Sequence, residues 1–123
     1  MSLSIASFSA AVAVLASHGH IKQRLVRAYE DNLSDIEEED VPIALKQTFA
    51  DLRHQMHRVA PLNGEGSICA SVRKMSVEEA DRCARMMVDL YGDLIRLSET
   101  GQAALPLGER DGKAVPPFLV KSG

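Results

Sequence analysis

Apolar side chains recur at alternating intervals of four and three residues between positions 45 and 59. This spacing places them along one side of an α-helix, whereas a half-buried β-strand requires a period of two. The repeat forms a heptad-like seam, so we expect this helix to pack lengthwise against a neighbour. The seam consists of Leu45, Phe49, Leu52, Met56 and Val59.

A broader apolar stripe follows near residues 77–98. Ser76 and Glu79 stand three residues apart at its start and match a capping box, in which each side chain binds the backbone N–H of the other residue. The width of the stripe suggests that this helix is contacted on two sides. Its members are Val77, Ala80, Ala84, Met87, Tyr91, Leu94 and Ile95, widened by Cys83, Leu90 and Leu97.

Helical spacing also marks the segments that come before the seam. Pro42 disfavours α geometry at Val41 and suits a first helical turn, so one helix is expected to end by Asp40 and the next to begin at Pro42. A short helix capped by Ser67 is expected over residues 68–74. The earlier helix is indicated by Ile21, Leu25, Ala28, Tyr29 and Ile36. An N-terminal helix, which Gly19 interrupts, is indicated by Ile5, Phe8, Val12 and Leu15.

These patterns predict an all-α fold, a small helical bundle with an N-terminal helix and an irregular C-terminal tail. The three principal helices are expected at about residues 22–40, 42–59 and 77–98. The chain has 123 residues, the length of one ordinary domain. We divide it into an N-terminal apolar helix (1–19), a helical domain (20–98) and a Pro/Gly-containing tail (99–123).

The tail holds one apolar hexad, VPPFLV at residues 115–120, within a polar segment. Its prolines lower the entropic cost of ordering an extended peptide, so Phe118 and Leu119 are candidate contacts for a protein partner. The alternative is that the hexad folds back onto a helix groove of its own chain, since tethering favours that contact.

Composition argues against several classes of function. The formal net charge of −3 gives no attraction toward nucleic acid or an anionic membrane, so neither is expected as a partner. The apolar run at residues 10–16 is short and lacks a basic flank, which argues against a signal peptide or membrane span. Cys69 and Cys83 form no CxxC pair, and two cysteines suit a reducing cytoplasm.

The stretch RHQMHR raises the question of a metal site. His54 and His57 stand three apart, but a structural zinc site needs four ligands and a catalytic one needs three. Flanking arginines would repel a dication, and counting 100° per residue puts both histidines on the polar face of the seam helix. No metal is therefore expected, and a metal-dependent sensor or enzyme using His54 and His57 is kept as an alternative.

A second alternative is a binder of anionic ligands. Basic side chains are dense around the expected short helix and the start of the last helix, and arginine suits phosphate or carboxylate recognition. Solvated surface charge is the simpler explanation. The candidate contacts are Arg58, Arg73, Lys74, Arg82 and Arg85.

Five stretches between residues 24 and 95 together resemble a group of short uncharacterised bacterial helical proteins. These are AYEDNL, EEEDVPIAL, FADLRHQMHRV, GEGSICASVRKMSVEEA and MMVDLYGDL. The resemblance implies an all-helical bacterial cytoplasmic protein and supplies no catalytic residues. The N-terminal helix and the tail lie outside it.

The leading interpretation is a noncatalytic interaction or regulatory module. The sequence brings together no acid, base, nucleophile and cofactor motifs, so no catalytic residue and no cofactor is assigned. Several apolar faces exceed what so few helices can cover, which predicts a homodimer and an unidentified protein partner. The partner interface is expected at Ile5, Phe8, Val12 and Leu15 of the N-terminal helix, together with Phe118 and Leu119.

Overall fold

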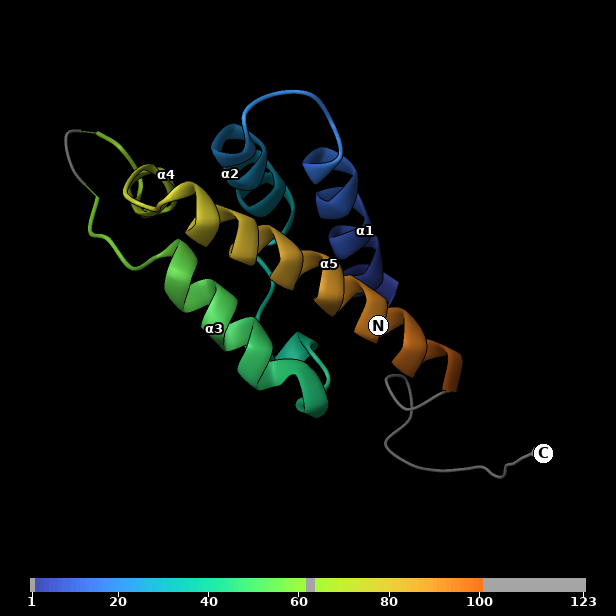
Figure 1. Cartoon of the computed structure of the whole chain (residues 1–123). Coiled ribbons are helices and arrows are strands. Elements are labelled where there is room, and N and C mark those ends of the chain that lie inside the picture. The colour runs from blue at the N-terminus through green and yellow to red at the C-terminus, as the bar shows by residue number, and fades with distance from the viewer. Residues whose placement is uncertain (1, 62–63, 101–123) are drawn as a thin grey trace.

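The computed structural model describes residues 2–61 and 64–100 of the chain, and every regular element in this part is a helix (Figure 1). This confirms the predicted all-α class. The α-helices are α1 (Ser2–Leu15), α2 (Ile21–Asn32), α3 (Lys46–Met56), α4 (Ser67–Arg73) and α5 (Val77–Thr100). Two short 3-10 helices, η1 (Glu38–Asp40) and η2 (Ile43–Leu45), precede α3.

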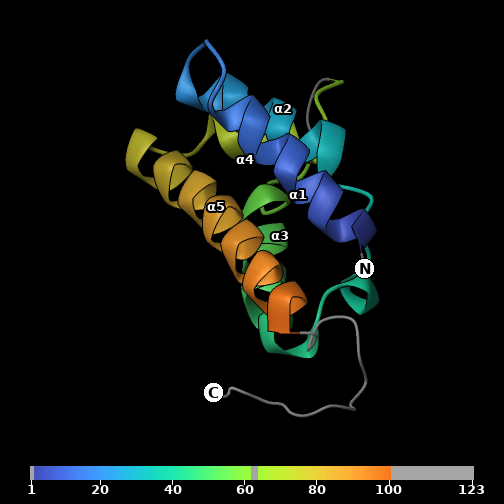
Figure 2. The same cartoon turned by 90° about the vertical axis from the view of Figure 1, so that its right-hand side faces the viewer.

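Helix α5 is the element on which the bundle is assembled. It contacts α1, α2 and α3, while α4 packs between α2 and α3. In Figure 1, α1 and α2 lie above α5 and α3 lies below it. The turned view in Figure 2 shows α1 running beside α5. A capping box at the start of α5 is confirmed, since Glu79 N–H donates to Ser76 Oγ at 3.0 Å and Ser76 N–H donates to Glu79 Oε1 at 2.9 Å.

One hydrophobic core joins all five α-helices. The predicted seam supplies Leu45, Phe49, Leu52 and Met56 to it, all of them buried. The rings of Phe8 in α1 and Phe49 in α3 meet edge to face, with centroids 6.1 Å apart. This contact ties the first helix to the seam helix through the centre of the molecule.

Helix α1 packs its apolar face against this core. Phe8 is fully buried and Leu15 is nearly so, while Ile5 and Val12 are half-buried. The hydroxyl of Ser4 also donates to the carbonyl oxygen of Asp40 at 3.2 Å. The chain therefore covers Phe8 and Leu15 itself, which leaves Ile5 and Val12 as the partly exposed members of the expected partner interface. Helix α1 shares the core of the helical domain.

The prediction of one helix over residues 22–40 is wrong, because α2 ends at Asn32. The side chains of Asn32 and Ser34 donate to backbone carbonyls four residues earlier, and such local bonds compete with helix continuation. Leu33 and Ile36 are nevertheless buried, and the Arg53 guanidinium donates to the carbonyl oxygen of Ile36 at 2.9 Å. The segment after α2 thus contributes apolar side chains to the core although its backbone is not helical.

The predicted boundaries of the seam helix are also wrong at both ends. Pro42 precedes the 3-10 helix η2, and α geometry begins only at Lys46. Helix α3 ends at Met56, so Val59 lies beyond it, and the backbone N–H of Val59 donates to the buried Ser71 hydroxyl at 2.9 Å. This bond draws the chain toward α4, where Gly66 occupies the cap position expected for Ser67.

We expect Phe8→Ala to destabilise the protein by about 3–5 kcal/mol, because a fully buried aromatic side chain is lost from a packed core. Chemical denaturation of the variant measures this. In a double-mutant cycle with Phe49→Ala, a coupling of about 0.5–1.5 kcal/mol is expected from the ring contact. Ile43→Ala is the control, since Ile43 is 86% exposed and should change stability by less than about 0.5 kcal/mol. A loss below about 1 kcal/mol for Phe8→Ala would contradict the packing described.

Candidate functional site

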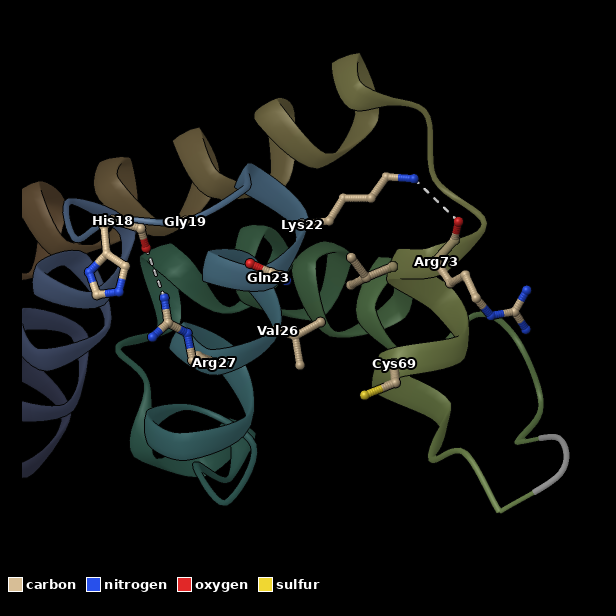
Figure 3. A pocket seen from close by; sticks show the side chains of 9 residues that line it. His18, Gly19, Lys22, Gln23, Val26, Arg27, Cys69 and Arg73 are labelled. Carbon is tan, nitrogen blue, oxygen red and sulfur yellow. Dashed lines mark hydrogen bonds between the residues drawn. The ribbon is translucent and has the colours of Figure 1, made fainter.

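An open groove of about 630 Å³ lies between α2 and α4 and extends to the turn that joins α1 to α2 (Figure 3). Its floor is apolar and its rim is polar and largely basic. The floor is formed by Val26, Cys69 and Val72. The rim is formed by His18, Gly19, Lys22, Gln23, Arg27 and Arg73.

The floor exists because two helices each direct one apolar residue away from the core centre. In α2, Leu25 is fully buried, and Val26, one residue later and about 100° around the helix, is half-buried beside α4. In α4, Val72 is 1% exposed and Cys69 is half-buried. Gly19 adopts a φ of +112°, which only glycine takes readily, and this turn brings His18 to the end of the groove.

Backbone carbonyls fix two cationic side chains on the rim. The Lys22 ammonium crosses the groove and donates to the carbonyl oxygen of Arg73 at 3.2 Å. The Arg27 guanidinium donates through Nη2 to the His18 carbonyl at 3.1 Å and to Ser17 Oγ at 3.4 Å. Figure 3 shows the bonds of Lys22 to Arg73 and of Arg27 to His18 at opposite ends of the groove. Neutral carbonyls leave the formal charge of both side chains in place.

Arg73 contributes less charge than its position on the rim suggests. Its guanidinium makes a bidentate ion pair with Glu65, with Nη2 to Oε1 at 2.9 Å and Nε to Oε2 at 3.0 Å. Hydrogen bonding from Arg73 lowers the pKa of Glu65, so the pair stays ionised at neutral pH. In Figure 3 the guanidinium points away from the floor.

Cys69 is a poor nucleophile in this setting. Burial raises the pKa of its thiol, and the negative charges of Glu30 and Glu65 raise it further. The thiolate, which is the reactive form, is therefore scarce at neutral pH. Cys69 serves the groove as a small apolar surface.

A chain of hydrogen bonds lies on another side of α2. The Tyr29 hydroxyl is 3.1 Å from His57 Nε2, and His57 Nδ1 is 2.9 Å from Ser67 Oγ. The rings of Tyr29 and His57 also meet edge to face, with centroids 5.5 Å apart. Burial lowers the pKa of His57 below its ordinary value of 6.5, and the charge of Arg53 lowers it further. The chain ties α2 to the segment between α3 and α4.

The two histidines of the RHQMHR stretch do not form a pair. His54 is exposed on α3, but His57 lies past the end of that helix and turns its ring against the buried Tyr29. Both histidines are exposed, as expected, but His57 is not on the helix face, because α3 ends at Met56. Both ring nitrogens of His57 already have protein partners. In the described part of the chain, no three His, Cys, Asp or Glu side chains cluster as a metal would require.

The five basic residues expected to bind anions do not converge. Arg73 and Arg85 are ion-paired with Glu65 and Asp81. The pKa of Glu79 is lowered mainly by a hydrogen bond from the Ser76 backbone, and the nearby charges of Arg58 and Arg82 lower it further. Lys74 is exposed at the C-terminal end of α4. Of these five residues, Arg73 lines the groove.

Sequence reasoning missed the rim cations of α2. The sequence pattern did not single out Lys22, Arg27 or Val26 as parts of a site. The available signal is Val26 itself, an apolar residue outside the stripe that α2 directs into the core. Phe118 and Leu119, proposed as tail contacts, lie outside the described residues.

No family model, curated protein or solved structure matches the chain. The resemblance to short bacterial helical proteins stays a prediction. Within residues 2–61 and 64–100, each helix is too short or too polar to cross a lipid bilayer.

The lowered pKa of His57 predicts a pH-dependent stability. The unfolded chain takes up a proton at His57 near pH 6.5, whereas the folded protein does so at lower pH. The stabilisation from neutral His57 is therefore complete above pH 6.5 and is lost as the pH falls through the folded-state pKa. Urea denaturation between pH 7 and pH 5 should show a declining free energy of unfolding, and His57→Gln should reduce the decline.

His54→Gln is the matched control, because it removes an exposed histidine from the same region. We expect it to keep the wild-type pH dependence. If His57→Gln leaves the decline unchanged as well, the proton uptake does not occur at His57.

Proposed function

We propose that the protein is a noncatalytic interaction module that works as a homodimer. The observation that carries this proposal is an incompletely covered apolar stripe along α5, which we call the outer stripe. Val77 and Val88 in it are 53% and 46% exposed. The outer stripe consists of Val77, Ala84, Val88, Tyr91 and Ile95.

The outer stripe is distinct from the side of α5 that faces the core. At 100° per residue, its members fall within one narrow arc, about a quarter turn from the buried row. Tyr91 and Ile95 are half-buried, and Ala84 is 9% exposed at the edge of the core. The buried row consists of Ala80, Cys83, Met87, Leu90 and Leu94.

Spacing along the outer stripe suits pairing with another helix. From Ala84 to Ile95 its members are separated by four, three and four residues, the intervals of a heptad seam. In a twofold dimer the same stripe from each chain meets its copy, so one apolar face supplies both sides of the interface. The broad stripe read from the sequence is thus divided between the core and a proposed second chain.

Several reactive side chains have structural roles, which supports a noncatalytic module. His57 is held by Tyr29 and Ser67, and burial raises the pKa of both cysteine thiols. The expected cytoplasmic location belongs to the same proposal, since a reducing compartment keeps Cys69 and Cys83 as free thiols.

We expect the mass from multi-angle light scattering to rise from monomer toward dimer with increasing concentration. Val88→Arg should shift this equilibrium toward monomer, because it places a charge within the apolar stripe. Circular dichroism should show an unchanged helix content, since the side chain is already 46% exposed.

Ile43→Arg is the matched control, because Ile43 is 86% exposed in η2 and lies outside the stripe. It should leave the dimer intact. A wild-type mass that stays monomeric at all concentrations would overturn the homodimer, and equal shifts in both variants would remove the outer stripe from the interface.

A further inference from the structure

The groove between α2 and α4 is a second surface of the protein, built by helices other than α5. Its volume of about 630 Å³ falls in the range of about 300–1,000 Å³ common for ligand sites. The floor offers Val26, Cys69 and Val72 as neighbours for one bulky apolar side chain. An occupant that fits the floor must therefore carry at least one apolar group.

The rim favours an occupant with negative charge. Lys22 uses one of its three N–H donors on the Arg73 carbonyl, and Arg27 uses only its Nη2 nitrogen on His18 and Ser17. Both side chains therefore keep donors and full charge while being held in place. Because they are already ordered, less conformational entropy is lost when an anion binds.

Carboxylates near the groove do not cancel this charge. Glu65 is engaged by Arg73, so that pair is neutral as a whole. Glu30 lies close enough to raise the pKa of Cys69. Lys22 and Arg27 outnumber it, and the imidazole of His18 adds a polar group to the same rim.

The positions of the two cations constrain where an occupant can place its negative charges. Lys22 and Arg27 are five residues apart on α2, and their charged groups are held at opposite ends of the groove by the carbonyl oxygens of Arg73 and His18. The apolar floor lies between these two ends. A peptide with an acidic residue on each side of an apolar one can therefore direct one carboxylate toward each cation.

We propose that the groove between α2 and α4 binds a short acidic segment of a partner protein, with an apolar side chain on the floor and carboxylates at Lys22 and Arg27. Nucleic acid is the less favoured polyanion, because the floor presents aliphatic and thiol surfaces in place of aromatic rings for stacking bases. The proposal concerns a surface other than the outer stripe and does not depend on the dimer.

The nature of the occupant is tested by NMR. The ¹⁵N-labelled full chain is titrated with capped pentapeptides. The first probe carries Glu-Leu-Glu between glycines, and the matched probes carry Gln-Leu-Gln and Glu-Ala-Glu. We expect the first to shift the amide signals of Val26, Cys69 and Val72. Exchanging the carboxylates for amides should weaken binding about fivefold or more, and truncating Leu to Ala should weaken it on the order of tenfold.

Variants of the protein test the rim. Lys22→Gln and Arg27→Gln should each weaken binding of the Glu-Leu-Glu probe by about two- to fivefold, and Lys22→Arg should retain it. Lys46→Gln is the matched control, because it removes the same charge from α3, beside the acidic segment Glu37–Glu39. Dispersed spectra of each variant establish that it is folded.

Several results would overturn the proposal. The first is an absence of groove shifts at millimolar Glu-Leu-Glu probe, and the second is equal binding of the Gln-Leu-Gln probe. The third is equal weakening by Lys46→Gln, which would indicate attraction by overall charge. Tighter binding of a thymidine pentanucleotide in the groove would also overturn the choice of an acidic peptide. If Val88→Arg binds the Glu-Leu-Glu probe with unchanged affinity, the site is independent of the dimer. If this variant loses affinity for the probe, the probe binds at the dimer interface and the assignment to the groove is overturned.

Discussion

Burial of one side of α5 is the constraint on which the rest of the structure depends. Helices α1, α2 and α3 each contact this helix, and its row of core residues runs from Ala80 to Leu94. The other helices are too short to be stable alone in water and gain most of their stability from this packing. The buried row of α5 is covered by the other helices, whereas the adjacent outer stripe is covered only in part. The bundle therefore has a packed core and still presents an apolar stripe at its surface.

The sequence was most informative where periodicity alone decides the structure. The seam from Leu45 to Met56 and the capping box of Ser76 and Glu79 were predicted in their observed roles. Helix ends were less predictable, because single hydrogen bonds decide them. Side-chain hydrogen bonds of Asn32 and Ser34 mark the end of α2, and Val59, beyond the end of α3, bonds to Ser71. Apolar spacing continues past both ends, so a pattern of burial does not reveal where helical backbone stops.

The groove was not predictable from the sequence for a different reason. It is made by two helices whose pairing no local pattern specifies, and Val26 becomes part of its floor only because α4 lies beside α2. The basic residues that composition made conspicuous, Arg73 and Arg85, are neutralised by carboxylates. Lys22 and Arg27 keep their charge because their partners are backbone carbonyls, a distinction visible only in three dimensions. Charge density in a sequence is therefore a poor guide to charge available at a surface.

The contact of Phe8 with Phe49, and of α1 with α5, has a consequence for the protein during its synthesis. The apolar face of α1 leaves the ribosome long before the residues that cover it, since the last fully buried core residue of α5 is Leu94. At about 5–20 residues per second, the delay lasts several seconds. The nascent chain thus exposes the apolar side chains of the α1 segment until α5 has been synthesised. Assembly of the core must wait until α5 has been synthesised, and until then the apolar side chains of α1 stay accessible to chaperones that shield emerging hydrophobic segments.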